Sequence, residues 1–332
     1  MTVSLPTPLL LGPNQPLDRP YRGGAGIARF RGTPQPSEFM PEDFVGSTTQ
    51  IFAGGGIGLT VLPDGRTLRD AVDADPVAYL GEEHVGRFGA RTMLLVKLLD
   101  TAERLFVHYH PDDAFAARHL RSPLGKTEAW AVIETEGDAY AALGFRRPVP
   151  RSEVRAWWDG QDTEAMLDAM NRVPLSAGDT LLVPAGLAHA IGPGVTLVEL
   201  QQPTDLSLLL ERRSLTEAEA LLGLDLDTAL DGLVVDATPA ERIETLRRGR
   251  GAETLFPADA DAFFSAERLQ VSGSRELEPS FSVLVVLDGT GTLESAAGSL
   301  PLRRGSTVLT AFGDGPVGLT GELQLIRCRP PR

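Results

Sequence analysis

Cysteine is almost absent from this sequence. The 332 residues contain a single cysteine, Cys328, close to the C-terminal end. An intramolecular disulfide and a thiolate metal cluster are therefore excluded, because each needs more than one thiol. Any bound metal must instead be held by histidine, aspartate, glutamate or glutamine side chains.

Basic residues are also scarce. Lys and Arg total 31 against 45 Asp and Glu, so the formal net charge is -14. An acidic chain of this kind is a poor partner for nucleic acid or for an anionic membrane, and we expect neither. No apolar run is long enough to span a membrane, and the N-terminal segment has no basic leader. These features favour a cytoplasmic protein.

The rest of the composition is typical of a folded, enzyme-sized protein. Hydrophobic residues make up 42% and charged residues 23%, and the chain is long enough for one large core or two packed domains. Glycine and proline often close short runs rich in Val, Leu and Thr, as in 92–100, 179–186 and 195–202. Such runs favour antiparallel β-structure, in a sandwich or a barrel.

Helical patterns are fewer and fall into three segments. They cover residues 67–78 with a break near Pro76, residues 152–171 with an interruption at Asp159 and Gly160, and residues 216–248 in two or three pieces. We therefore expect a first domain over residues 1–214 with a helical insertion near 152–171, a helical segment over 215–250, and a second, smaller β-domain over 251–332. The second β-domain has no histidine, which favours a role in structure, as an interface or in shaping the pocket.

Only five histidines occur, and two of them are separated by one residue. His108 and His110 would lie on the same face of an extended strand, as two ligands of one ion require. Glu128, 18 residues after His110, starts another apolar run that could bring a carboxylate to that face. His84 follows two glutamates in a polar segment and His119 lies in an expected exposed turn, so we interpret both as structural.

A second motif supplies a further histidine. Residues 178–189 contain Gly178, five residues, Pro184, one residue, Gly186, two residues and His189. This pattern resembles the second cupin motif, and the paired histidines with Glu128 resemble the first. The resemblance implies a mainly β fold with helical insertions, with a cupin-type β-barrel (jelly roll) and a second, degenerate cupin-like β-domain. Three imidazoles and one carboxylate suit Zn, Fe, Mn, Co or Ni better than Ca or Mg.

Over its first two thirds the sequence resembles the type I phosphomannose isomerase family, the zinc-dependent cupin enzymes that interconvert mannose 6-phosphate and fructose 6-phosphate. The matching segments, in family order, are residues 94–100, 108–113, 125–130, 171–194 and 197–205. The resemblance implies a site in which zinc is held by His108, His110, Glu128 and His189, while Lys126, Glu199 and Lys97 are active-site residues. It also implies proton transfer between C1 and C2 of a sugar through a metal-stabilised enediolate, with Glu199 as base and Lys126 as its partner.

The sequence departs from the family pattern at three positions. His108 stands where the family usually has glutamine, Phe106 where it has a serine, and Leu209 where it has an arginine. The last two changes remove a hydroxyl and a cation that are natural partners of a phosphate. Arg212 and Arg213 are near Leu209 in sequence but out of register with the missing arginine.

Two alternatives to a sugar or sugar-phosphate isomerase remain open at this level. One is a metal-containing cupin that binds a sugar or metabolite without catalysis, and the other is a metal-dependent dioxygenase. Asp112 and Asp113 are interpreted as turn residues rather than ligands. A monomer is plausible, because the second β-domain could pack on the first within one chain.

Overall fold

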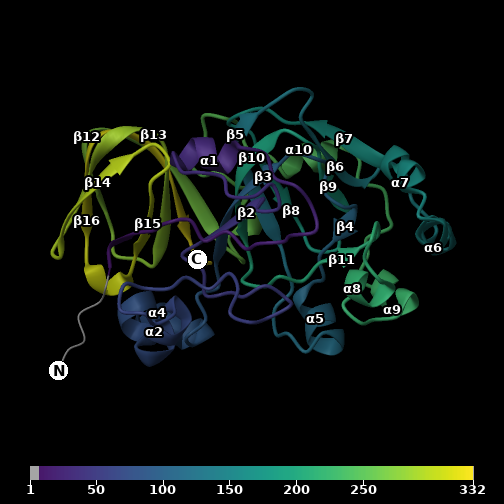
Figure 1. The fold of residues 1–332 in the computed structure, drawn as a ribbon, viewed down its shortest axis with the longest axis horizontal. Helices are drawn as coiled ribbons and strands as arrows, with labels where there is room; N and C mark the ends of the chain where they lie inside the picture. Colours follow the sequence, from purple (N-terminus) through teal and green to yellow (C-terminus); the bar gives the residue numbers. More distant parts are fainter. Residues whose placement is uncertain (1–6, 332) are drawn as a thin grey trace.

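The computed structural model describes residues 7–331. It is 22% helix and 32% strand, with three antiparallel sheets, which confirms the expected mainly β fold. Two of the sheets have five strands each, and the third is formed mostly by the C-terminal part of the chain and lies beside them (Figure 1). Within residues 7–331, no helix has both the length and the apolar character needed to cross a bilayer.

The two five-stranded sheets form what we call the histidine-bearing region, because the candidate metal ligands come from it. The first sheet has the order β2 (Glu42–Val45), β3 (Leu95–Thr101), β10 (Val195–Gln201), β5 (Glu128–Thr135) and β8 (Thr180–Val183). The second has the order β11 (Leu208–Leu209), β4 (His108–Tyr109), β9 (His189–Ile191), β6 (Tyr140–Phe145) and β7 (Met170–Pro174).

Strand alternation divides the first sheet into two faces. Lys97 of β3 lies opposite Glu199 of β10 in the strand register, and both side chains line a cavity. Their neighbours Leu98 and Val198 also pair and belong to the main hydrophobic core. Because side chains alternate along a strand, Lys97 and Glu199 face the cavity together with apolar neighbours such as Leu99, while Leu98 and Val198 point to the opposite face and pack in the core.

The third sheet forms the C-terminal region. It contains three long strands, β12 (Ser265–Leu277), β13 (Ser282–Ser295) and β16 (Val317–Arg329), with β14 (Gly298–Arg303) and β15 (Thr307–Thr310). The short 3₁₀ turns η1 (Ala258–Ala260) and η2 (Phe312–Asp314) flank it. The sheet also includes β1 (Leu9–Leu10), which pairs with β15.

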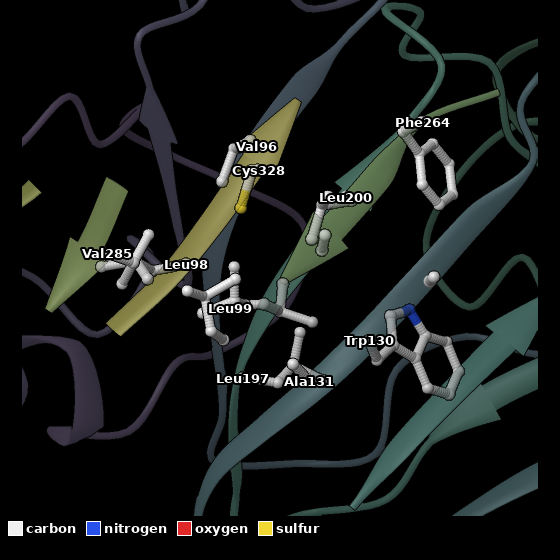
Figure 2. Packing of buried hydrophobic residues seen from close by; sticks show 14 of the residues in the cluster. Val96, Leu98, Leu99, Trp130, Ala131, Leu197, Leu200, Phe264, Val285 and Cys328 are labelled. Atoms are coloured by element: carbon white, nitrogen blue, oxygen red, sulfur yellow. The ribbon is translucent and has the colours of Figure 1, made fainter. Parts of the chain in front are cut away.

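The two regions share one hydrophobic core. Val283 and Val285 of β13 pack in the same cluster as strands of the histidine-bearing region, whereas Leu284 and Val286 face the interior of the C-terminal region. Figure 2 shows Val285 and Cys328 close to Val96 and Leu98. The Cys328 thiol is free and fully buried there, and burial raises its pKa well above the ordinary range.

The expected helical segments are present, in shorter pieces. Residues 67–78 form α2 (Leu68–Ala74) and α3 (Pro76–Leu80), separated where Asp75 caps the start of α3. Residues 152–171 form α6 (Arg151–Gly160) and α7 (Thr163–Ala169), after which β7 begins. Residues 216–248 form α8 (Glu217–Ala220), α9 (Leu226–Leu230) and α10 (Ala240–Thr245).

Three further helices were not expected: α1 (Gly26–Arg31), α4 (Glu82–Phe88) and α5 (Asp113–His119). His84 therefore lies in a helix rather than in a loop, and His119 ends a helix rather than occupying a turn. The reason for the second correction is local, because the Asp112 side chain accepts a hydrogen bond from the Phe115 amide at 2.7 Å and so caps α5.

The N-terminal end of the chain also differs from the sequence-based division. Residues 9–10 were assigned with residues 1–214 to the first domain, but they extend the sheet of the C-terminal region by pairing with residues 308–309. An edge strand offers unpaired backbone donors and acceptors that a distant segment can satisfy. The boundaries near residues 214 and 250 stay predictions.

Candidate metal centre and its cavity

Three histidines from two neighbouring strands converge on one point. His108 in β4 pairs directly with His189 at the start of β9, and His110 follows two residues after His108 on the same face. One ligand nitrogen from each histidine lies within 4.8 Å of the others. The alternation expected for His108 and His110 is thus present, and His189 joins them. His84 and His119 are not part of this cluster.

Backbone carbonyls orient all three rings. Nδ1 of His108 lies 2.8 Å from the carbonyl oxygen of Phe106. Nδ1 of His110 lies 2.8 Å from that of Leu206, and Nδ1 of His189 lies 2.8 Å from that of Leu187. A carbonyl oxygen only accepts, so each Nδ1 carries the proton and each Nε2 keeps a free lone pair. Burial, with the nearby Lys126 charge, lowers the pKa of His110 to about 3, which keeps that ring neutral.

Glu128 adds a carboxylate to the same point. Its Oε2 lies 2.9 Å from Nε2 of His110, and its Oε1 lies 3.3 Å from Nε2 of His189. The indole N–H of Trp130 donates to Oε1 at 2.9 Å and fixes the carboxylate. Burial opposes ionisation of Glu128, but the Lys126 ammonium group 2.9 Å away outweighs it and holds the pKa of Glu128 well below its usual range.

This donor set fits a divalent transition metal. Nε2 of His110, Nε2 of His189 and Oε2 of Glu128 are buried, and none of them has a hydrogen-bond partner of acceptable geometry among residues 7–331. Imidazole lone pairs directed at a carboxylate repel it unless a cation lies between them. Three nitrogens and one oxygen form the mixed set that Zn and its neighbours in the first transition row prefer.

Lys126 lies beside this cluster. Its Nζ is 2.9 Å from Oε2 of Glu128, and its side chain is buried. Its backbone amide donates to the Pro111 carbonyl at 2.9 Å, and the next amide, that of Thr127, donates to the Gln202 side chain at 2.8 Å. The first bond holds the segment before β5 against the loop that follows His110, and the second holds it against the end of β10, so Lys126 and Glu128 are positioned together.

Glu199 and Lys97 form a second buried pair in the cavity. Their charged atoms are 3.8 Å apart, and their side chains are 6% and 1% exposed. Burial, together with the negative charge of Glu128, raises the pKa of Glu199 to about 8. All three residues expected from the resemblance to be active-site groups, Lys97, Lys126 and Glu199, line the same cavity as the histidine cluster.

Sequence reasoning missed a cluster of charged residues around Lys97. Glu42 in β2 lies 2.9 Å from Lys97 Nζ and 2.5 Å from Arg19 Nε, and Asp205 lies 3.6 Å from Lys97. These residues belong to separate segments and carry no motif that links them. Trp130 could have been found, because it lies two residues after Glu128 and therefore on the same face of β5.

The cavity has a volume of about 190 Å³ and one largely apolar wall. Phe106 and Leu209 line this wall together with Tyr21, whose ring meets that of Phe106 edge to face at 6.3 Å. Arg213 stacks on Phe106 and bonds to Glu211, while Arg212 lies over Trp158. Neither arginine is among the described residues that line the cavity.

Comparison with known proteins gives a consistent picture. The family described as mannose-6-phosphate isomerase, cupin domain, matches residues 252–330. Mannose-6-phosphate isomerase ManA from Bacillus subtilis is 31% identical over 264 residues, which cover 74% of this chain and 79% of that protein. Mannose-6-phosphate isomerase from Streptococcus mutans is 29% identical over 260 residues, covering 76% and 79%.

Solved structures show the same fold. Mannose 6-phosphate isomerase from Bacillus subtilis superposes with a TM-score of 0.75 at 24% identity, covering 97% of this chain and 99% of that one. A variant of phosphomannose isomerase from Salmonella typhimurium gives a TM-score of 0.72 at 18% identity, with coverage of 97% and 99%. From the similarity to the Bacillus relative over most of both chains, this protein belongs to the mannose-6-phosphate isomerase family of the cupin superfamily.

Proposed function

We propose that the protein is a metal-dependent aldose–ketose isomerase that interconverts mannose 6-phosphate and fructose 6-phosphate, or a related pair of sugars. The observation that carries the proposal is the convergence of three imidazole nitrogens and one carboxylate in a cavity that also contains the buried Glu199 and Lys97. His108, His110, Glu128 and His189 would hold the metal. Zinc is the first candidate, with Fe, Mn, Co or Ni as alternatives.

The reaction moves two protons and needs no oxidant or reductant. In the conversion of aldose to ketose, the C2–H and O2–H bonds break, and a C1–H and an O1–H bond form. When bound, the metal supplies Lewis-acid stabilisation of the negative charge that develops on these oxygens. Glu199 takes the proton from C2 and returns it to C1, acting as a general base and then a general acid.

The lysines support this transfer. Lys97 pairs with Glu199 across β3 and β10 and holds the carboxyl group in place. Lys126 is positioned beside Glu128, at the metal side of the cavity, where its charge would favour negative charge on the substrate oxygens. A buried lysine and a buried glutamate are costly to retain without a role, which favours a catalyst over a cupin that only binds its ligand.

Glu199→Gln tests the proposal. We expect turnover to fall by about 100- to 10,000-fold, because the amide cannot accept the proton, while the metal content stays unchanged. Incorporation of deuterium from solvent at the transferred position should fall with it. Glu136→Gln is the control, because Glu136 is an exposed residue paired with Arg29 outside the cavity. Unchanged turnover in Glu199→Gln would remove this residue from the mechanism.

The metal requirement is tested separately from the role of Glu199. Elemental analysis of the purified protein should give one transition-metal ion per chain, and a chelator should abolish turnover. Metal and sugar binding without turnover would favour the binding-only cupin. A sugar metabolite as substrate is consistent with the cytoplasmic protein expected from the sequence.

A further inference from the structure

The direction of the His108 ring depends on the two peptide groups that precede it. Nδ1 of His108 donates to the Phe106 carbonyl oxygen at 2.8 Å, which leaves Nε2 free to bind a metal ion. The first of these peptide groups contains the Phe106 carbonyl and the Val107 amide, and the second contains the Val107 carbonyl and the His108 amide. Because a peptide group is planar, its carbonyl turns only if its amide turns with it. A partner that fixes Val107 therefore also fixes the acceptor that orients His108.

Glu211 bonds both of these peptide groups. Oε2 of its carboxylate accepts a hydrogen bond from the Val107 amide at 3.0 Å, and its own backbone amide donates to the Val107 carbonyl at 3.0 Å. The two residues are 104 positions apart in the sequence and meet because β11 pairs with β4 (Figure 1). Val107 is fully buried, and the Glu211 side chain is 7% exposed. Loss of the carboxylate would leave a buried amide without this acceptor, which favours rotation of the peptide group.

Two arginines hold the Glu211 carboxylate in position. Nη1 of Arg104 donates to Oε2 at 2.6 Å, and Nη2 donates to Oε1 at 2.9 Å. Nε of Arg213 donates to Oε1 at 3.1 Å, and its guanidinium lies 4.5 Å from the centre of the Phe106 ring. A two-point contact between guanidinium and carboxylate restricts the rotation of both groups. The carboxylate that accepts from Val107 is therefore fixed on both of its oxygens.

Strand β4 gives His108 little support of its own. The strand is two residues long, and its register with β9 consists of the single pair of His108 and His189. A side chain on so short a strand depends on contacts beyond the strand to keep its direction. Groups that orient a metal ligand without touching the metal commonly change metal affinity by about 10- to 100-fold.

We propose that Glu211 is a positioning residue for the metal ligand His108, and that Arg104 and Arg213 hold Glu211 in place for this role. The inference rests on the proposed function, because it requires that the histidine cluster binds a metal ion. Glu211 acts at a distance from that ion, through the planar peptide group between Phe106 and Val107.

Glu211→Gln tests the role through metal affinity, measured by competition between the protein and a chromophoric chelator for Zn²⁺. The amide places an NH₂ group where one of the carboxylate oxygens accepted from arginine, so the two-point contact with Arg104 is lost. We expect the Kd for Zn²⁺ to rise by about 10- to 100-fold. The visible absorption bands of the Co²⁺-loaded variant should also shift, because they report the coordination geometry of the ion.

Asp179→Asn is the matched control. The Asp179 carboxylate is 10% exposed, lies 3.2 Å from Arg247 and 2.8 Å from Arg250, and accepts from the Ser176 amide at 2.9 Å. Asp179 is not among the described residues that line the cavity. Its replacement should lower stability in the same way but leave the Zn²⁺ affinity and the Co²⁺ spectrum unchanged. An equal loss of affinity in both variants would show that Glu211 acts only through stability and would overturn the inference. Unchanged affinity and spectrum in Glu211→Gln would overturn it as well.

Arg104→Lys covers the case in which Glu211→Gln does not fold. Lysine keeps the positive charge but not the two-point contact, and the Glu211 carboxylate stays available to Val107. We expect the Kd for Zn²⁺ to rise by about 3-fold in a variant whose circular dichroism is unchanged. Full Zn²⁺ affinity in Arg104→Lys would contradict the positioning role alone. Failure of the unmodified protein to bind Zn²⁺ or Co²⁺ would contradict the proposed function, and the inference with it.

Discussion

The histidine-bearing region and the C-terminal region are both antiparallel β-structures that share a hydrophobic core, yet the cluster enclosed by the second differs from the cavity enclosed by the first. The interior cluster of the C-terminal region consists only of leucine and valine, among them Leu284, Val286 and Leu325. The cavity of the histidine-bearing region instead holds buried Lys97, Glu199 and the histidine cluster. The same type of scaffold therefore encloses either an apolar core or a reactive site, depending on which residues alternate inward.

The apolar cluster of the C-terminal region contributes to stability, whereas the charged cavity of the histidine-bearing region holds the groups proposed for the reaction. Burying a charged group costs free energy unless partners or a ligand compensate it, and the C-terminal region avoids that cost in its interior cluster. The family match to residues 252–330 falls on this region, which contributes none of the candidate ligands. The match there concerns the C-terminal region alone, and the reaction must be argued from residues 97–199.

His189→Ala should have the largest effect, because it removes one of the three converging nitrogens. We expect loss of bound metal and a fall in turnover of at least about 1000-fold. Elemental analysis and an isomerase assay on the same sample provide the measurement. His119→Ala is the matched control, since His119 packs against Phe115 in α5, outside the cluster. Full metal occupancy in His189→Ala would remove this residue from the ligand set.

Glu42→Gln should lower the free energy of unfolding, because it removes a carboxylate that pairs with two buried cations. The variant leaves Arg19 and Lys97 with one fewer carboxylate, and we expect a loss of about 3 kcal/mol in the free energy of unfolding at pH 7. Chemical denaturation followed by circular dichroism measures it. Glu136→Gln, at an exposed ion pair, should cost less than about 1 kcal/mol.

The same variant gives a pH test with a defined sign. Burial would raise the pKa of Glu42, but Arg19 and Lys97 outweigh burial and lower it from 4.5 to about 2. Its contribution to stability is therefore complete above pH 4.5 and is lost as the pH falls toward 2. The unmodified protein should lose more stability over this interval than Glu42→Gln. Parallel pH profiles would contradict the assignment.

How much of this site the sequence could predict depends on how local each signal is. The spacing of His108 and His110 placed them on one face of a strand, and the resemblance of the His189 segment to the second cupin motif added the third histidine. Lys97, Lys126 and Glu199 required the family resemblance. Arg19 and Glu42 could not be predicted, because they lie on distant segments that meet Lys97 only after the sheets form, and Asp205, although it ends the matching segment 197–205, had no partner that the sequence identified.

The fold shows the same dependence on local signals. The strands and the break next to Pro76 were predictable from periodicity and from turn residues, whereas the interruption expected at Asp159 and Gly160 falls after them, because α6 continues to Gly160. The helices α4 and α5 were not, because α4 buries no side chain and α5 buries only Phe115 and Ala116, which leaves too few apolar positions to show a helical period. The pairing of β1 with β15 joins opposite ends of the chain and has no local signature.

Leu284→Ala tests the apolar interior of the other region. The side chain is fully buried in the leucine and valine cluster, so we expect a loss of about 2–5 kcal/mol in the free energy of unfolding. Metal content and the turnover of the folded protein should stay unchanged, because Leu284 faces away from the shared core. Leu300→Ala, at a half-buried position against the same cluster, should cost less. A loss of metal in Leu284→Ala would contradict the separation of stability from chemistry.

Asp112→Ala should have the smallest effect, and it tests whether stability and site geometry are coupled within the histidine-bearing region. The Asp112 carboxylate caps α5 through the Phe115 amide, so its removal should cost about 1 kcal/mol. The preceding Pro111 carbonyl accepts the Lys126 amide, so a shift at the start of α5 should also raise KM. Asp112→Asn retains a capping oxygen and should restore both stability and KM, as followed by thermal unfolding and by kinetics. A change in stability without any change in KM would show that Lys126 is positioned independently of α5.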